Sequence, residues 1–393
     1  MNEDKHFAEG FSDDKDWRKA AAAAAKAART RLGSGPCDLA LVFVAEAYSD
    51  FDPEEFSTLL AKGLAPLRVL GCNASGVIAG RKEVEMLPAI SILAMRLPGV
   101  RVQPFTFSQA ELGKLENGAA LVKELDLYPN ENPKFMILGD PATGDPERMA
   151  ALFNEGYPGA PLVGGMASGM LLHKPSWMLL GSHVVKQGLA GVALVGPVEI
   201  QTVVAQGCRP IGEPLIVTKA EGNVLHELGG RNPLEVLRET LSKCTPDDQR
   251  LARSSLFAGL VMNESRSEFR RGDFVIRNLL GYDNESGSLV LGASLRRGQT
   301  LQFQLRDAHT SDLDFSMLLG QLPETDAAPR GALLFSCCGR GKGLYGESDH
   351  DATLVQSLRG PVPMAGFFAN GEFGPVGGRN FVHGYTSSLA LIK

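Results

Sequence analysis

The chain of 393 residues lacks any apolar run that approaches the roughly eighteen residues a membrane helix needs. It also lacks a strong charge of either sign, because 39 lysines and arginines stand against 45 aspartates and glutamates, for a net charge of −6 at pH 7. Binding to nucleic acid or to an anionic membrane requires a basic surface. The sequence therefore predicts that neither a membrane nor a nucleic acid is a partner.

Cysteine is sparse and unpatterned. The six cysteines show no C-x-x-C spacing and are too few for a disulfide framework, which is typical of reduced thiols in the cytosol. The N-terminus has no apolar signal-peptide core. The seven histidines are scattered, and His350 with Asp349 and Asp351 has no second cluster to complete a metal site. We therefore expect a cytoplasmic protein without a metal or a cofactor.

What the chain does contain is a recurring pattern of apolar runs. Three sets of three runs suit buried strands: 39–48, 68–76 and 89–97; 134–144, 161–169 and 188–196; 331–341, 361–371 and 385–393. The middle run of each set ends in a similar signature, NASG, MASG or FANG. The spacing of the first two runs leaves room for a helix. Each set should form a strand–helix–strand–strand unit with its signature at an equivalent strand end.

These units predict an α/β (α+β) protein with mixed β-sheets flanked by helices. A fourth, more degenerate copy is visible at 256–266, 273–283 and 288–293. The alternative is a chance pattern, because any α/β protein contains such strings. The length suggests two domains, and a glycine-containing stretch at 196–212 divides the chain into two similar domains, 36–205 and 206–393.

The first 35 residues are expected to form an alanine-rich helix. It should run from about Asp13 to Leu32, with Ser12 as its N-cap and Gly33 at its end. Acidic residues stand early in this segment and basic residues late, which suits the helix dipole. The same acidic residues argue against a transit peptide.

The richest candidate site follows the first strand of the third set. The run LLFSCC leads through Cys337 into a glycine-rich loop that carries Arg340 and Glu347. Glycine allows the backbone to approach another group closely. The next apolar run, PVPMAGFFANG, is followed by Glu372 and contains Asn370 near its end. If the two strands are neighbours, their ends bring a thiol, a guanidinium, a carboxamide and a carboxylate together.

These groups suit a zwitterionic ligand such as an amino acid. The Arg340 guanidinium can bind a carboxylate through two parallel hydrogen bonds, and Glu372 with Asn370 can bind an ammonium group. The alternative is an ion pair between Arg340 and Glu372 that closes the sheet end. The signatures of the first two sets add candidate ligand contacts, or simple turn residues, at Asn73, Ser75 and Ser168.

Catalytic alternatives rest on the same loop. Its glycines fit G-x-G-x-x-G, but the following helix should start only at Ser348 or Asp349, which is too late for a dinucleotide-binding turn. Cys337 would be a nucleophile if Arg340 favoured its thiolate, with Cys338 on the opposite side of the strand. A buried cysteine that packs as a small apolar group is the competing interpretation. A cysteine-dependent enzyme is thus the alternative to a binding protein, and we expect the latter.

Several strings occur in one order along the chain: GCNASGVIAG, PLVGGMASG, GDFVIRNLLG, LLFSCCGRGKGLYGE and PVPMAGFFANGEFGPVGGRN. In these strings the chain resembles the FIST proteins, named for F-box and intracellular signal transduction. The resemblance covers nearly everything after residue 35, spanning the FIST N-terminal and C-terminal domains. It implies an intracellular sensory protein that binds small ligands such as amino acids.

The chain differs from some members of this family at both of its ends. In eukaryotic relatives an F-box precedes the two domains, and the first 35 residues are too short for one. No kinase, cyclase or methyl-accepting segment follows Lys393, so a separate signalling effector is the expected output partner. An adaptor that binds a protein through the same cleft is the third interpretation, and the oligomeric state stays open.

Overall fold

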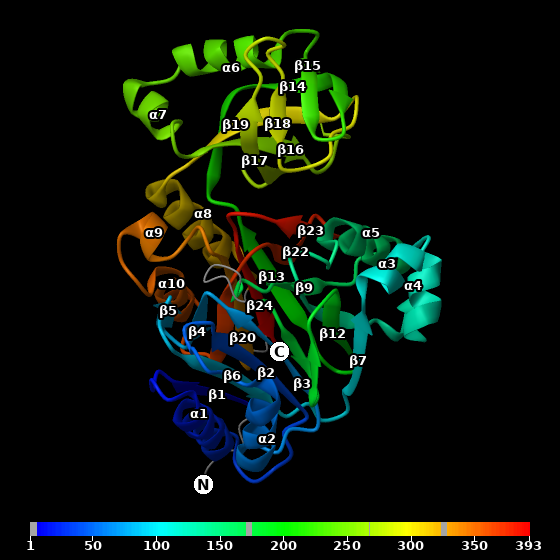
Figure 1. Cartoon of the computed structure of the whole chain (residues 1–393), viewed down its shortest axis with the longest axis vertical. Coiled ribbons are helices and arrows are strands. Elements are labelled where there is room, and N and C mark those ends of the chain that lie inside the picture. The colour runs from blue at the N-terminus through cyan, green and yellow to red at the C-terminus, as the bar shows by residue number, and fades with distance from the viewer. Residues whose placement is uncertain (1–5, 170–174, 267, 324–327) are drawn as a thin grey trace. The chain divides into compact units, whose positions relative to one another are not determined.

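Two compact units make up the computed structural model, which describes residues 6–169, 175–266, 268–323 and 328–393 (Figure 1). Unit 1 comprises residues 1–204 and 318–393, and unit 2 comprises the intervening residues 205–317. Unit 1 contains three six-stranded sheets, whereas the strands of unit 2 close into a barrel. Among the described residues, no helix has both the length and the apolar character to cross a membrane.

Unit 1 is built from three repeats of one order of elements. The first repeat comprises β1 (Phe7–Ser12), α1 (Trp17–Leu32), β2 (Leu39–Ala45), α2 (Pro53–Gly63), β3 (Val69–Ala74), β4 (Gly76–Ala79), β5 (Lys82–Glu85) and β6 (Ile90–Met95). The second comprises β7 (Arg101–Phe107), α3 (Gln109–Lys114), α4 (Gly118–Leu125), the 3-10 turn η1 (Pro129–Glu131), β8 (Lys134–Gly139), α5 (Pro146–Gly156), β9 (Leu162–Met166), β10 (Met178–Leu180), β11 (His183–Val185) and β12 (Leu189–Val195). The third comprises β13 (Ile200–Ala205), β20 (Gly331–Cys337), α9 (Lys342–Tyr345), α10 (His350–Leu358), β21 (Met364–Ala369), β22 (Glu372–Val376), β23 (Arg379–His383) and β24 (Ser387–Ile392), with unit 2 inserted after β13. Helix α8 (Ala308–Gln321) begins in unit 2 and ends in unit 1, before β20.

The strand pairing is the same in all three repeats. Strand β2 lies parallel to β3 and antiparallel to β6. Strand β8 has the same relation to β9 and β12, and β20 has it to β21 and β24. A parallel pair needs a crossover connection, which α2, α5 and α10 supply. The predicted mixed α/β class and the recurring strand–helix–strand–strand unit are thus confirmed.

Each repeat also donates a hairpin to another repeat, which the sequence pattern did not predict. The hairpin β4–β5 pairs with β21, β10–β11 pairs with β3, and β22–β23 pairs with β9. Each hairpin covers a sheet edge whose backbone N–H and C=O groups would otherwise be unpaired. The exchange forms a closed cycle, so every sheet contains strands from two repeats.

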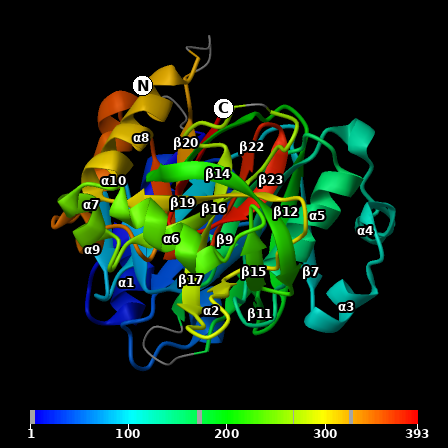
Figure 2. The ribbon, with the colours of Figure 1, turned by 90° about the horizontal axis from the view of Figure 1, so that it is seen from above.

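The inner faces of the three sheets share one apolar core. The rings of Phe43, Phe335 and Phe367 lie 5.0 to 6.3 Å apart within it. Helices cover the outer faces, and α3, α4 and α5 gather outside β7 and β12 (Figures 1 and 2). The alanines of α1 allow it to pack tightly on β1, where a Cβ atom added to Gly10 would lie 2.1 Å from the carbonyl oxygen of Ala24.

The start of the N-terminal helix differs from the prediction. The helix begins at Trp17, because Asp16 is the N-cap and accepts hydrogen bonds from the N–H groups of Arg18 and Lys19. Ser12 ends β1 and is not the cap. The predicted end is confirmed, since Gly33 follows the last helical residue with a φ of 81°.

Unit 2 is a closed barrel of antiparallel strands. It comprises β14 (Cys208–Glu221), β15 (Val224–Leu228), α6 (Pro233–Ser242), α7 (Pro246–Leu251), β16 (Leu256–Val261), β17 (Phe274–Tyr282), β18 (Leu289–Leu291) and β19 (Thr300–Arg306). The expected fourth copy of the repeat supplies β16, β17 and β18 and is wrong as a repeat, because these strands pair antiparallel without a crossover helix. Unit 2 begins at residue 205, one residue before the predicted boundary at 205/206, and residues 318–393 return to unit 1.

Candidate functional site

Arg340 is fully enclosed at the end of β20. Its guanidinium donates two hydrogen bonds to the Asp351 carboxylate, from Nε to Oδ2 at 2.7 Å and from Nη2 to Oδ1 at 3.1 Å, and a third to the Tyr345 hydroxyl. Burial alone would raise the pKa of Asp351, but the charge of Arg340 holds that pKa well below its usual range. An ion pair therefore closes this sheet end, but with Asp351 in place of Glu372. The fork predicted to bind a ligand carboxylate is occupied by the protein itself.

Glu372 is also fully buried. Its Oε2 accepts hydrogen bonds from the hydroxyl and the N–H of Thr386 at 2.8 and 3.3 Å, and its Oε1 accepts one from the N–H of Gly371 at 3.3 Å. Burial raises the pKa of Glu372 to about 8. Among the described residues, the charge of Arg340 acts on Glu372 and both side chains are enclosed by the protein, whereas the side chains of Asn370 and Glu347 face solvent.

The two adjacent cysteines lie in surroundings that oppose ionisation. Burial raises the pKa of Cys337 far above its ordinary value, and the negative charge of Glu372 raises it further. Burial also raises the pKa of Cys338, although hydrogen bonds from Ser75 and Ser168 act in the opposite direction. A nucleophilic cysteine needs a lowered pKa. The geometry thus favours the interpretation of both cysteines as packing residues.

The three signature segments meet where the repeats adjoin. The N–H of Ser75 donates to Ser168 Oγ at 2.8 Å, and the Ser168 hydroxyl donates to the carbonyl oxygen of Phe368. Cys338 Sγ lies 3.4 Å from Ser75 Oγ. NASG, MASG and FANG therefore occupy adjoining strand ends. Ser75 and Ser168 are buried in contact with each other, and their visible role is to join the repeats.

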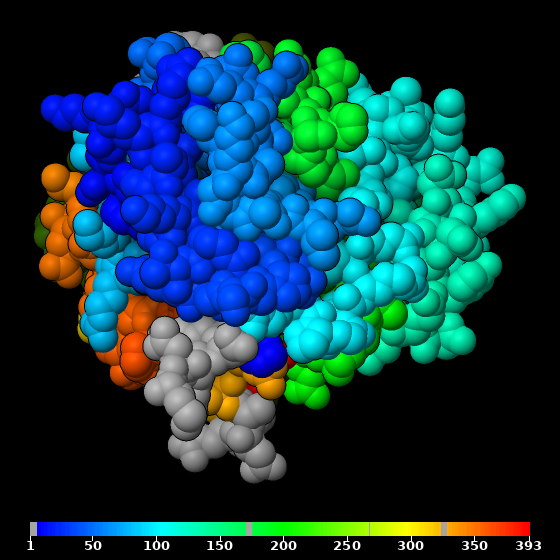
Figure 3. Space-filling model, turned by 90° about the horizontal axis from the view of Figure 1, so that it is seen from below, coloured from blue at the N-terminus to red at the C-terminus, as the bar shows by residue number. Residues whose placement is uncertain are grey.

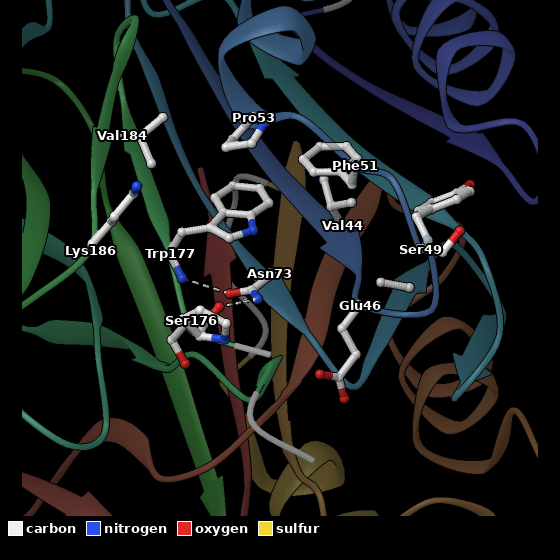
Figure 4. A pocket seen from close by; sticks show the side chains of 13 residues that line it. Val44, Glu46, Ser49, Phe51, Pro53, Asn73, Ser176, Trp177, Val184 and Lys186 are labelled. Carbon is white, nitrogen blue, oxygen red and sulfur yellow. Dashed lines mark hydrogen bonds between the residues drawn. The ribbon is translucent and has the colours of Figure 1, made fainter. Parts of the chain in front are cut away.

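A pocket opens at the carboxyl ends of the parallel strands β2 and β3, next to Asn73 (Figure 4). We call it the aromatic pocket. Its volume is about 270 Å³. The lining residues come from the ends of β2 and β3, the loop before α2 and the first residue of that helix, and the hairpin β10–β11 with the segments on either side of it: Val44, Ala45, Glu46, Tyr48, Ser49, Phe51, Pro53, Asn73, Pro175, Ser176, Trp177, Val184 and Lys186. Ligands of α/β proteins bind preferentially at the carboxyl ends of parallel strands.

The wall of the aromatic pocket is held in a fixed geometry. The rings of Phe51 and Trp177 stack with centroids 5.3 Å apart and an interplanar angle of 6°. The Asn73 side-chain oxygen accepts a hydrogen bond from the backbone N–H of Trp177 at 2.9 Å, and its amide nitrogen donates to the Pro175 carbonyl oxygen at 3.2 Å. Glu46 is 3% exposed and its N–H donates to the carbonyl oxygen of Ala74 at 2.8 Å. Asn73 was predicted as a ligand contact, and here it lines the pocket and holds the main chain at Pro175 and Trp177.

The other polar residues of the aromatic pocket were not predicted from the sequence. Glu46 and Lys186 carry opposite charges, and Trp177 and Asn73 lie between them in the view of Figure 4. One signal was available for Glu46, because it follows the first strand of its set as Cys338 follows the first strand of the third. Lys186 gave no signal, since only the hairpin exchange brings it to this strand end. In the described part of the chain, no group of three or more His, Cys, Asp or Glu side chains could hold a metal ion.

Comparison with known proteins gives a consistent result over the chain. The family model of the FIST N domain matches residues 38–231, and that of the FIST C domain matches residues 233–375. An uncharacterized protein of Mycobacterium tuberculosis is 38% identical over 384 residues, which is 97% of this chain and 98% of the relative. An uncharacterized protein of Mycobacterium bovis is 37% identical over 386 residues, 97% of each chain.

Proposed function

Because the chain belongs to the FIST family, whose domains are sensory domains of signal transduction, we propose that it senses a small zwitterion, an amino acid, in the aromatic pocket. The observation that carries this proposal is the presence of Glu46 and Lys186 in the wall of one small pocket, with an aromatic surface beside them. A carboxylate can bind an ammonium group and an ammonium side chain can bind a carboxylate. The aromatic rings then contact the apolar part of the ligand.

The size of the aromatic pocket supports a small ligand. Its volume of about 270 Å³ lies just under the range of roughly 300 to 1,000 Å³ that drug-sized ligands occupy. The two charged side chains differ in their exposure to solvent, because Glu46 is buried whereas Lys186 is exposed. In this proposal Glu46 fixes the ammonium group deep in the pocket, and Lys186 approaches the carboxylate at the entrance.

The output of such a sensor would pass to a separate signalling protein. A ligand that contacts β2, the loop before α2 and the hairpin β10–β11 spans two repeats, because the hairpin belongs to the second repeat and pairs with β3 of the first. Ligand binding would therefore stabilise an exchanged hairpin, which is a change that a partner can recognise. Which protein recognises it is a matter for co-purification with and without ligand.

A thermal-shift screen of the twenty amino acids tests the proposal. A ligand at a hundred times its dissociation constant should stabilise the fold by about 2.7 kcal/mol. The best amino acid should stabilise wild type but lose most of this effect on Glu46→Gln and Lys186→Gln. The matched controls Glu54→Gln and Lys62→Gln remove the same charges from exposed positions of α2 outside the pocket. Equal stabilisation of all four variants would remove the aromatic pocket as the site.

A further inference from the structure

A second cavity, of about 290 Å³, lies at the other end of the strands of unit 1. Phe7 and Glu9 of β1, Arg31 at the end of α1, Arg81 in the turn between β4 and β5, and Val362 before β21 form its wall. We call it the arginine cavity. Phe7 and Leu39 both pair with Met95, so the start of β1 lies by the amino end of β2, whereas the aromatic pocket lies at the carboxyl end.

The arginine cavity joins two repeats. The first repeat supplies β1, α1 and the turn of its hairpin, and the third supplies α10 and the segment before β21. Figure 3 shows the same proximity at the surface, where orange atoms of the third repeat lie beside the blue N-terminal segment. The cavity therefore lies where the exchanged hairpin β4–β5 docks on β21.

Charge in the arginine cavity does not balance. Its wall holds two guanidinium groups and one carboxylate, a net charge of 2 − 1 = +1. Glu9 is engaged already, because Oε1 lies 3.4 Å from Arg31 Nη1 and Oε2 accepts the Met364 N–H at 3.2 Å. Arg81 makes one side-chain hydrogen bond, from Nη1 to Ser357 Oγ at 3.4 Å. Its guanidinium thus lines the cavity without a carboxylate partner among the described residues.

The rest of the wall is apolar or already hydrogen-bonded. Phe7 and Val362 are buried apolar residues, and the flanking Pro361 and Pro363 have no backbone N–H to offer. The Gln356 amide is satisfied by the N–H and the carbonyl oxygen of Val362, at 3.0 and 2.8 Å. The donors that remain for a ligand are therefore guanidinium N–H groups, next to an apolar wall.

We propose that the arginine cavity is a second binding site, for a small organic monoanion that joins a carboxylate to an apolar body. The planar fork of Arg81 matches the two oxygens of a carboxylate. One negative charge neutralises the net charge of the site, whereas a doubly charged phosphate would leave an excess beside Glu9. The apolar body packs on Phe7 and Val362. This inference does not depend on the aromatic pocket binding anything.

Benzoate is a suitable probe, followed by calorimetry or NMR titration of the full-length protein. Wild type and Lys82→Gln should bind it equally, because Lys82 is the next residue of the same hairpin but does not line the cavity. Arg81→Gln, at an exposed turn position, should bind it about tenfold more weakly or worse, as expected for the loss of a charged hydrogen bond. The neutral isostere benzamide should not bind.

A variant that should tighten benzoate binding complements the variant that should weaken it. Glu9→Gln raises the net charge of the wall to +2 and should tighten benzoate binding, provided its melting temperature matches wild type. An amino acid that binds the aromatic pocket should not displace benzoate. No benzoate binding to wild type at about 10 mM, a concentration that reveals even millimolar affinity, would overturn the proposal. So would equal affinity for Arg81→Gln, or tighter binding of inorganic phosphate than of benzoate.

Discussion

The carboxyl ends of β2 and β3 in the first repeat pair as those of β20 and β21 do in the third. The first of these strand ends borders a pocket, whereas the second is filled by buried side chains. Ala45 pairs with Ala74 as Cys337 pairs with Ala369, and Met178 faces Cys72 as Val77 faces Phe367. The hairpin turns then place Lys186 in the position of Glu85, and Val184 in that of Glu83. The two ends can thus be compared residue by residue.

At the third repeat the hairpin residues bind the segment that follows β20. The N–H of Lys342 donates to Glu85 Oε1 at 2.8 Å, and that of Ala352 donates to Glu83 Oε1 at 2.7 Å. Beneath them Arg340 and Asp351 fill the strand end. At the first repeat Val184 and Lys186 face the aromatic pocket. The hairpin side chains, and not the strand topology, therefore decide whether a strand end is filled or open.

The largest effect should come from breaking the ion pair that fills the third strand end. Arg340→Ala leaves the Asp351 carboxylate buried without its cation, so we expect the free energy of unfolding to fall by about 3 to 5 kcal/mol. Urea unfolding measures this loss. Lys186→Ala at the open strand end is the control and should change stability by about 0.5 kcal/mol or less, since it is exposed. Similar losses in both variants would erase the contrast between the two ends.

The next effect concerns pH. Burial, together with the nearby charge of Asp351, raises the pKa of Glu83 to about 8, and burial raises the pKa of Glu372 to about 8. The folded protein then holds protons that the unfolded chain has released. The associated stability is fully present below about pH 4.5 and is lost as pH rises toward 8, by at most about 1.4 kcal/mol per pH unit for each group.

Unfolding measurements between pH 5 and pH 8 check this slope. Glu83→Gln and Glu372→Gln should each flatten it, because glutamine does not titrate. Asp351 does not interfere, since its lowered pKa acts only in acid, below the ordinary aspartate range. A wild-type stability that rises over this interval, or variants with an unchanged slope, would contradict the assignment.

These residues also show how far the sequence alone could lead. The apolar runs predicted the strand–helix–strand–strand units, because strands buried on both faces are continuously apolar. The signatures predicted equivalent strand ends, and the structure shows in addition that these ends adjoin, because Ser168 hydrogen-bonds both Ser75 and Phe368. The partner of Arg340 could not be predicted, because Asp351 and Glu372 are both acidic and only the fold decides which one it reaches. Lys186 was beyond prediction because its hairpin pairs with another repeat.

A smaller effect, on ligand affinity, should follow when the open strand end of the first repeat receives the negative charge that the third repeat carries at the equivalent position. Lys186→Glu copies Glu85 of the third repeat into the wall of the aromatic pocket. We expect the amino acid with the largest thermal shift to bind about 10 to 100 times more weakly, since a charged hydrogen bond is worth roughly 1.5 to 3 kcal/mol. Calorimetric titration measures the affinity. Lys62→Glu is the matched control, and an equal loss there would indicate a general charge effect.

The smallest effect is a ranking of thiols. A free Arg340 would favour the Cys337 thiolate, but Arg340 is paired with Asp351, and burial raises the pKa of Cys337 far above its ordinary value. Burial also raises the pKa of Cys37 to about 11 and that of Cys72 well above its ordinary value. Cys244 lies in unit 2 and is partly exposed, and its pKa is raised by burial to a lesser extent.

Limiting iodoacetamide at pH 8, followed by peptide mass spectrometry, should therefore label Cys244 first among these four thiols, because the thiolate is the species that reacts. Cys244→Ser should leave little fast labelling. Arg340→Ala offers the complementary test, since loosening the third strand end should expose the partly buried Cys337 further and raise its labelling toward that of Cys244. Fast labelling of Cys337 in the wild-type protein would mean that its strand end opens in solution, and the contrast between a filled and an open strand end would then be one of degree.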